Sequence, residues 1–317
     1  MTDGWILPLD APGASLQAAG GKGANLARLV SAGLPVPPGF LLLTSAYLAY
    51  VAYNQLPPAI DSVLETADAQ DPVALQAASD TIRARFSAGT LPPELAQALR
   101  QAYAGLGAPP VAVRSSATAE DLPDLSFAGQ QDTFLNITSQ DALLQAVVAC
   151  WGSLWTARAI GYRARNRIPH HDLALAVIVQ EMVPAEASGV LFTADPLNGR
   201  RTEMVLEATL GLGEALVSGQ VEPDRFRLDA ASGRILARAL GAKAVSVRPA
   251  KGGGTSKRAE DAAGRQALPE EAVAELAHLG RQVDRLFGAP QDVEWAWAGG
   301  RIWLLQSRPI TSLFPVP

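Results

Sequence analysis

The residues that suit chemistry on phosphate begin with Lys22, which stands in the glycine-rich segment Gly20–Gly23. Apolar residues follow at helical spacing through Val30, and Gly33 is placed to end the helix, so Lys22 is expected at the amino-terminal edge. Free amides, the helix dipole and an ammonium group would meet there, which favours a polyphosphate ligand. Because the spacing differs from the P-loop signature, a glycine-rich helix start with a solvated lysine is the alternative.

A second candidate is Arg114, which we expect where a short β-branched strand, Val111–Val113, ends. Arginine presents a rigid fork of donors for phosphate oxygens, and the following Ser-Ser-Ala-Thr segment adds hydroxyls. A loop with small residues at 127–131 then returns to a second apolar run, 133–137. Its backbone amides could approach an anion closely. We interpret the pair as an arginine clamp and a phosphate-covering lid; a surface arginine in an ordinary β-hairpin is the alternative.

The third candidate is a carboxyl-terminal hairpin with a turn at Gly299-Gly300. Strand alternation puts Asp292 and Glu294 on one face, and Gln306 and Arg308 share a face across the hairpin. Two carboxylates beside an amide oxygen form a hard oxygen site that suits Mg²⁺, which completes its shell with waters and substrate phosphates. Arg308 would balance the charge. The alternative is a polar strand surface.

An adenine site is indicated where residues 173–182, a nearly continuous apolar run, leave the core through Gln180, Glu181, Met182 and Val183. The run predicts a strand buried on both faces. Its exit would expose backbone amide and carbonyl groups beside a methionine, an arrangement that can hold the edge and face of adenine. A plain exit from strand to loop is the alternative.

The remaining pattern supplies the elements that must position these residues. Residues 44–107 are predicted to be helical, and residues 139–167 to form one long helix with a basic end. Residues 269–287 predict a further helix. The basic segment 241–266, which contains Lys243 and Arg248, is expected to be a solvated surface loop. Further strands are expected at 188–195 and 203–208, with a hairpin turned at 231–233.

The composition limits the class of protein. A chain of 317 residues can form one large or two to three smaller domains, and its net charge of −5 argues against a general nucleic-acid binder. The single cysteine, Cys150, excludes a disulfide within the chain and favours a reducing compartment. The sequence shows neither a basic amino-terminal leader nor an apolar run of membrane-spanning length. We therefore expect a soluble, cytoplasmic protein without nucleic-acid or membrane partners.

Four ordered motifs together resemble one known family: GGKGANLARL, AVRSSATAEDLPDLSFAGQQDTFLN, VQEMV with SGVLFTADP, and DVEWAW followed by LLQSRPIT. They look like the amino-terminal ATP-binding domain of phosphoenolpyruvate synthase (pyruvate, water dikinase), and the same motifs occur in rifampicin phosphotransferase. The resemblance covers nearly the entire chain. It implies an α+β fold of the ATP-grasp type, with two lobes of mixed sheet and helices closing on MgATP.

The resemblance also implies three stretches of different role. Residues 1–110 would form the helical and mixed-sheet part, residues 111–200 the lid and central sheet with the adenine hinge, and residues 201–317 the lobe with the metal-binding hairpin.

Motif by motif, the resemblance implies three groups of site residues. The first would hold or cover the phosphates: Lys22, Arg114, Gly129, Gln130, Thr133 and Arg308. The second would line the adenine pocket: Gln180, Glu181, Met182 and Val183. The third would hold Mg²⁺: Asp292, Glu294 and Gln306, the last also reaching the nucleotide. Lys22, Arg114 and Arg308 would carry the catalytic role, because phosphoryl transfer needs mainly positioning and charge neutralisation.

One departure from the family concerns the phosphoryl acceptor. Full-length members continue after the SRPIT motif into a mobile domain with an acceptor histidine, whereas this sequence stops at Pro317 and places His170, His171 and His278 in other settings. We expect a MgATP-dependent component that phosphorylates a histidine on a separate domain or protein, for the phosphorylation of pyruvate. The ATP-binding part of a rifampicin-type antibiotic phosphotransferase and a non-catalytic ATP-sensing module are the alternatives.

Overall fold

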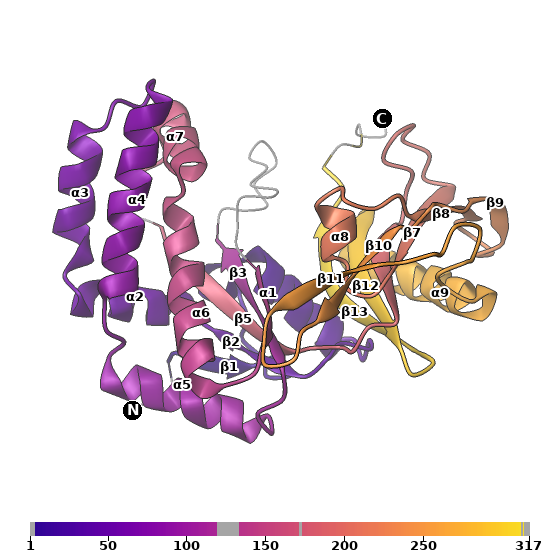
Figure 1. The fold of residues 1–317 in the computed structure, drawn as a ribbon, viewed down its shortest axis with the longest axis horizontal. Coiled ribbons are helices and arrows are strands. Elements are labelled where there is room, and N and C mark those ends of the chain that lie inside the picture. Colours follow the sequence, from indigo (N-terminus) through magenta and orange to yellow (C-terminus); the bar gives the residue numbers. More distant parts are fainter. Residues whose placement is uncertain (1–3, 119–132, 171–172, 312, 314–317) are drawn as a thin grey trace. The chain divides into compact units, whose positions relative to one another are not determined.

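The computed structural model describes residues 4–118, 133–170, 173–311 and 313. Helices and antiparallel sheets divide the chain into two compact units (Figure 1). Unit 1 comprises Met1–Ala24 and Pro38–Glu181, and unit 2 comprises Asn25–Pro37 and Met182–Pro317. The chain therefore passes from one unit to the other three times. The α+β class is confirmed, while the three stretches of different role remain a prediction.

Unit 1 contains a five-stranded sheet in the order β1-β2-β5-β3-β4. The strands are β1 Ile6–Pro8, β2 Gly39–Leu42, β3 Val111–Ala117, β4 Thr133–Ile137 and β5 Leu175–Glu181. Each pairs with its neighbours in antiparallel fashion, so this sheet is not of the mixed kind that the resemblance implied. The first six residues of β5 are all buried, which confirms the predicted strand with two covered faces.

Helices cover one face of this sheet. They are α2 Thr44–Tyr53, α3 Leu56–Thr66, α4 Pro72–Ala88, α5 Pro93–Gly105, α6 Gln140–Gly152 and α7 Ala157–Asn166. Their core is aromatic: the ring of fully buried Trp151 lies 5.0 Å from that of Tyr50 and 6.2 Å from that of Tyr47, measured between centroids. Such ring pairs contribute about 1 kcal/mol beyond the area they bury. The predicted helical region 44–107 is confirmed.

The single long helix expected over residues 139–167 is wrong. The helix α6 ends at Gly152, a 3₁₀ turn covers Ser153–Trp155, and α7 begins after Thr156, whose hydroxyl accepts a hydrogen bond of 3.3 Å from the amide of Ala159. Thr156 has an extended backbone and is the N-cap of a new helix, a role that threonine favours.

The break also turns Arg163 of the expected basic helix end into the core, where the side chain is 1% exposed. Its Nη1 donates to the carbonyl of Leu154 at 2.8 Å, and the guanidinium lies 5.0 Å from the ring centroid of Trp155. Burial lowers the pKa of Arg163 to about 10. Arg163 therefore ties the two helical segments together inside unit 1.

Among the described residues, no single helix has the length and apolar character of a membrane span. The helix α6 with its 3₁₀ turn and the helix α7 reach that length and apolar character only when taken together, and they are bent by 41° relative to each other.

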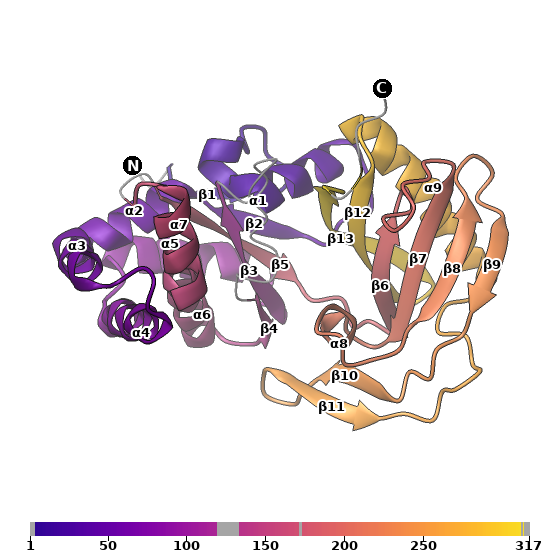
Figure 2. The same ribbon diagram turned by 90° about the horizontal axis from the view of Figure 1, so that it is seen from above.

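Unit 2 is built on a six-stranded antiparallel sheet in the order β13-β12-β6-β7-β8-β9. Its strands are β6 Ala187–Phe192, β7 Glu203–Leu210, β8 Asp224–Asp229, β9 Ile235–Ala239, β12 Gln291–Ala298 and β13 Arg301–Pro309. The helix α9, Glu270–Phe287, confirms the helix predicted over 269–287, and it lies against one face of this sheet (Figure 2). A Cβ added at Gly280 would come within 2.6 Å of the Leu191 side chain, so the helix and the sheet approach each other closely here. A short helix, α8 Glu214–Val217, follows β7.

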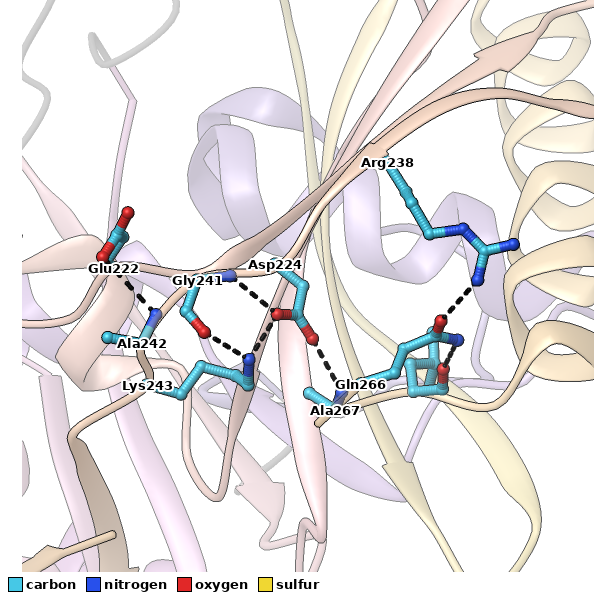
Figure 3. A network of polar contacts seen from close by, with 9 residues as sticks. Glu222, Asp224, Arg238, Gly241, Ala242, Lys243, Gln266 and Ala267 are labelled. Carbon is cyan, nitrogen blue, oxygen red and sulfur yellow. Dashed lines mark hydrogen bonds and ion pairs between the residues drawn. The ribbon is translucent and has the colours of Figure 1, made fainter. Parts of the chain in front are cut away.

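The expected solvated loop at 241–266 is also wrong in part. Two strands, β10 Val245–Pro249 and β11 Thr255–Ala259, pair in an antiparallel hairpin. Just before it, Lys243 is fully buried and forms an ion pair with Asp224 of β8 (Figure 3). The base of the hairpin is therefore a fixed part of unit 2.

Candidate functional site

The Lys22 segment is fastened to the sheet of unit 1. The helix α1, Leu16–Ser31, is interrupted at Gly20, which has φ 69°, so the helix restarts beside Lys22 as predicted. A Cβ on Gly20 would lie 2.2 Å from the carbonyl oxygen of Ser116 on β3. The Ser116 hydroxyl donates to the carbonyl of Ala19 at 2.7 Å and accepts from the amide of Gly23 at 3.0 Å. These contacts hold the glycine-rich helix start close to β3.

Arg114 lies within β3 rather than at the end of a strand, because the strand continues to Ala117. The expectation of a strand that ends at Arg114 is therefore wrong. In the antiparallel pairing, Arg114 stands directly opposite Thr133 of β4 and Ile178 of β5. Opposite residues of such a pair have Cβ atoms about 5 Å apart. The fold thus brings Arg114 and Thr133 together, while Gly129 and Gln130 lie outside the described residues.

One face of the five-stranded sheet gathers the predicted residues of unit 1. Alternation places Ala112, Arg114 and Ser116 on the same face of β3. Gln180 of β5 lies directly opposite Ala112 and therefore shares this face. The opposite face packs under the helices, since it carries the core residues Val111, Val113, Val177 and Val179. The face opposite the helical core therefore holds Arg114, Thr133, Gln180 and the contact to the Lys22 segment.

The four predicted adenine residues stand at a crossing between the units. Gln180 and Glu181 end β5 in unit 1, and Met182 and Val183 begin the next passage in unit 2. The amide of Glu181 donates to the carbonyl of Pro38 at 2.9 Å. Gln180 is 1% exposed and Val183 8%, so both are buried. Contact of these residues with adenine stays a prediction.

In unit 2 the predicted metal residues face one another across the β12–β13 hairpin. Asp292 pairs with Arg308 and Glu294 with Gln306, which confirms the register inferred from the sequence. Arg308 donates through Nε to Asp292 Oδ2 at 2.8 Å, and its Nη2 lies 2.7 Å from the same oxygen. Arg308 therefore balances the charge of Asp292, as expected.

The electrostatics of this face favour a cation. Burial raises the pKa of Asp292, Arg308 lowers it, and the negative charges of Glu294 and Glu207 raise it again. Within the described ranges, no three His, Cys, Asp or Glu side chains converge into a metal cluster. Two carboxylates and the buried amide of Gln306 nevertheless fit Mg²⁺, which takes few protein ligands and fills its shell with water and phosphate oxygens.

Glu207 was missed in the sequence. It lies on β7 opposite Val190 of β6, and Val190 lies opposite Glu294, so Glu207 and Glu294 share one sheet face. Arg225 of β8 donates to Glu207 at 2.9 Å through Nε and at 2.5 Å through Nη2. The sequence of β7 shows that its residues alternate between two faces. Only the pairing of β7 with β6, and of β6 with β12, shows that Glu207 lies on the face of Glu294.

Comparison with known proteins gives a consistent result. Residues 16–314 match the model of the pyruvate phosphate dikinase AMP/ATP-binding domain family. A rifampicin phosphotransferase of Streptomyces sviceus is 45% identical over 305 residues, which cover 94% of this chain and 35% of the relative. A probable phosphoenolpyruvate synthase of Methanothermobacter thermautotrophicus is 41% identical over 93% of this chain and 44% of the relative. The phosphoenolpyruvate synthase of Pyrococcus furiosus is 38% identical, with 93% and 42% covered. The chain thus spans less than half the length of these relatives.

Proposed function

The chain belongs to the pyruvate phosphate dikinase AMP/ATP-binding domain family, and from this premise we propose that it is a MgATP-dependent phosphotransferase module of the phosphoenolpyruvate synthase type. In this proposal the fold works as an ATP-grasp. The module passes a phosphoryl group from ATP to a histidine on a separate domain or protein, for the phosphorylation of pyruvate. A cytoplasmic location, expected from the single cysteine, is part of the proposal.

The observation that carries the proposal is the division of polar residues between two sheet faces. The sheet face of unit 1 opposite the helical core holds Arg114, Thr133 and Gln180. The polar face in unit 2 holds paired carboxylates, an amide and Arg308. Cations and helix-start amides suit phosphates, and oxygen ligands suit Mg²⁺, so each face by itself carries one of the two kinds of group that MgATP requires.

Each group then has a role in the transfer. Lys22, Arg114 and Arg308 would neutralise charge that develops on the phosphates, and Thr133 with Gly129 and Gln130 would cover them. Asp292, Glu294 and Gln306 would hold Mg²⁺, which supplies further charge neutralisation and orients the phosphate oxygens. Gln180, Glu181, Met182 and Val183 would fix the adenine.

Calorimetric titration of the chain with MgATP tests this proposal. We expect a dissociation constant between micromolar and sub-millimolar, as is typical of enzyme substrates. Glu294→Ala should abolish binding, whereas Glu275→Ala on the exposed side of α9 should leave it unchanged. Absence of binding by the folded wild-type chain, or equal binding by Glu294→Ala, would contradict the proposal.

A second candidate function follows from the 45% identity to a rifampicin phosphotransferase. The ATP-binding roles would be the same, and the acceptor would differ. The chain should be combined with histidine-bearing parts of each type of relative, and phosphate transfer to pyruvate compared with transfer to rifampicin. Transfer to rifampicin alone would select this second function.

A further inference from the structure

The β10–β11 hairpin is docked on the segment that follows β7. Gly211 lies beside Val247 in a parallel bridge, and the amide of Leu212 donates to the carbonyl of Val247 at 2.9 Å. Gly211 has φ 75°, and a Cβ there would lie 2.3 Å from the Val247 carbonyl oxygen. On β11, the Thr255 hydroxyl donates to Glu214 Oε2 at 3.1 Å. Both strands of the hairpin are therefore held within unit 2.

One residue of this hairpin reaches the chain just beyond the predicted adenine residues. Arg248 of β10 donates through Nη1 to the carbonyl of Ala185 at 3.2 Å. The amide of Ala185 donates to the carbonyl of Val183 at 2.8 Å, so the segment from Met182 to Ala185 is tightly turned. Ala185 is 4% exposed and Val183 8%. Movement of the Ala185 carbonyl would therefore shift Val183 as well.

The guanidinium of Arg248 is itself held in place. Its Nη2 lies 3.7 Å from Glu260 Oε1, and its Nε donates to the hydroxyl of Ser246 at 3.4 Å. That hydroxyl donates to Glu260 Oε1 at 2.7 Å. The hydrogen bond from Ser246, together with nearby arginines, lowers the pKa of Glu260, so the carboxylate is ionised at neutral pH. Arg248 thus contacts Ser246 and Glu260 of the hairpin as well as the Ala185 carbonyl.

The base of the hairpin is anchored by the buried network of Figure 3. Lys243 forms its ion pair with Asp224 and donates to the carbonyl of Gly241 at 2.7 Å. Asp224 also accepts from the amides of Gly241 at 3.0 Å and Ala267 at 2.7 Å. Both chain segments that enter and leave the hairpin region are therefore joined to β8. Because its base is anchored in this way, the hairpin holds β10, and with it the backbone of Arg248, in place.

We propose that Arg248 is a positioning residue for the nucleotide: it fixes the Ala185 carbonyl and thereby the Met182–Ala185 segment, so that the β10–β11 hairpin sets the affinity and base choice of the adenine site. This inference rests on the proposed function. The physical reason is that hydrogen bonds to a base edge weaken steeply when donor and acceptor shift from their preferred distance and angle. Arg248 acts through the backbone and needs no contact with the nucleotide.

The test compares the affinity of the full chain for MgATP and MgGTP by calorimetry, with weak binding measured by competition. Arg248→Met keeps the apolar stem and removes the donors. We expect about a tenfold loss of MgATP affinity, the effect of one hydrogen bond to a charged group, and a smaller ratio of ATP to GTP affinity. Arg248→Lys, which keeps a charged donor, should restore part of the MgATP affinity and part of the ratio of ATP to GTP affinity. Lys257→Met, at an exposed position on β11, is the control and should behave as wild type.

The outcomes separate the two proposals. A general loss of folded structure would weaken both nucleotides equally, so an unchanged ratio in Arg248→Met overturns the inference. Wild-type affinity in Arg248→Met overturns it as well and leaves the proposed function intact. A wild-type chain that binds neither nucleotide would overturn the proposed function and, with it, this inference.

Discussion

Unit 1 and unit 2 both cover one face of an antiparallel sheet with helices and leave polar residues on the other, but they build their interiors differently. All five tyrosines belong to unit 1, where Tyr47 and Tyr50 pack around Trp151, whereas unit 2 has none. Unit 2 instead buries an ion pair, Lys243 with Asp224. Unit 1 also buries the charged Arg163 and the neutral phenol of Tyr47, so both volume and ionisation matter there, whereas the buried pair makes unit 2 sensitive to the loss of either opposite charge.

The largest expected effect is the loss of one partner of the buried pair in unit 2. Lys243→Met leaves Asp224 charged, with its other partners limited to amides, and should reduce the free energy of unfolding by about 3 to 5 kcal/mol. Denaturant unfolding followed by tryptophan fluorescence measures this change. The double variant Lys243→Met, Asp224→Leu should recover part of it, because no buried charge remains unpaired. Equal stability of Lys243→Met and wild type would refute the role of the pair.

The second effect belongs to unit 1 and appears at alkaline pH. Burial raises the pKa of Tyr47 from 10.0 to about 12. The folded protein then holds the phenolic proton more tightly than the unfolded chain. This contribution of up to about 3 kcal/mol is fully present below pH 10 and is lost as the pH rises toward 12.

Unfolding of unit 1 between these pH values can be followed by tyrosine absorbance. Tyr47→Phe should flatten the fall in stability, whereas Tyr53→Phe, at a side chain that is 54% exposed, should not. An identical pH profile in Tyr47→Phe and wild type would count against this explanation.

A third prediction concerns the backbone contact beneath Lys22. Gly20→Ala places a Cβ against the Ser116 carbonyl at a positive φ, so stability should fall by about 2 kcal/mol and MgATP affinity with it. Gly33→Ala is the matched control, since Gly33 has φ 72° but open space around the added Cβ. It should cost about 1 kcal/mol and leave nucleotide affinity unchanged. Thermal unfolding and calorimetry measure both; equal losses of affinity would contradict the assignment of the Lys22 segment.

The smallest expected effect tests the acidic face of unit 2. Glu207→Gln removes one negative charge from the sheet face that carries Glu294, which weakens the attraction for a cation, so Mg²⁺ affinity in the presence of ATP should fall by roughly two- to fivefold. Titration of Mg²⁺ at fixed ATP concentration measures the change, with exposed Glu275→Gln as the charge-matched control. Similar losses in both variants would show that net charge, rather than the position of Glu207, is responsible.

The two units also differ in how well the sequence predicted them. The register of the β12–β13 hairpin was correct because a short turn and strand alternation fix which residues lie opposite one another. The break after α6 was missed because the apolar spacing continues through it, and only the capping hydroxyl of Thr156 and the buried Arg163 mark the new helix.

The sequence by itself determined the local features: the helix start at Lys22, the doubly buried strand β5, the helical region of unit 1 and the pairing of Asp292 with Arg308. Tertiary structure decided the rest. Lys243 lies in a basic, glycine-rich segment that is typical of a solvated loop. In the fold it is nevertheless buried against Asp224, a residue distant in sequence, which also accepts a hydrogen bond from the amide of Ala267. The face of Glu207 and the contact of Gly20 with Ser116 depend in the same way on partners outside the local segment. Local patterns fix periodicity, whereas burial and charge pairing depend on what the fold brings alongside.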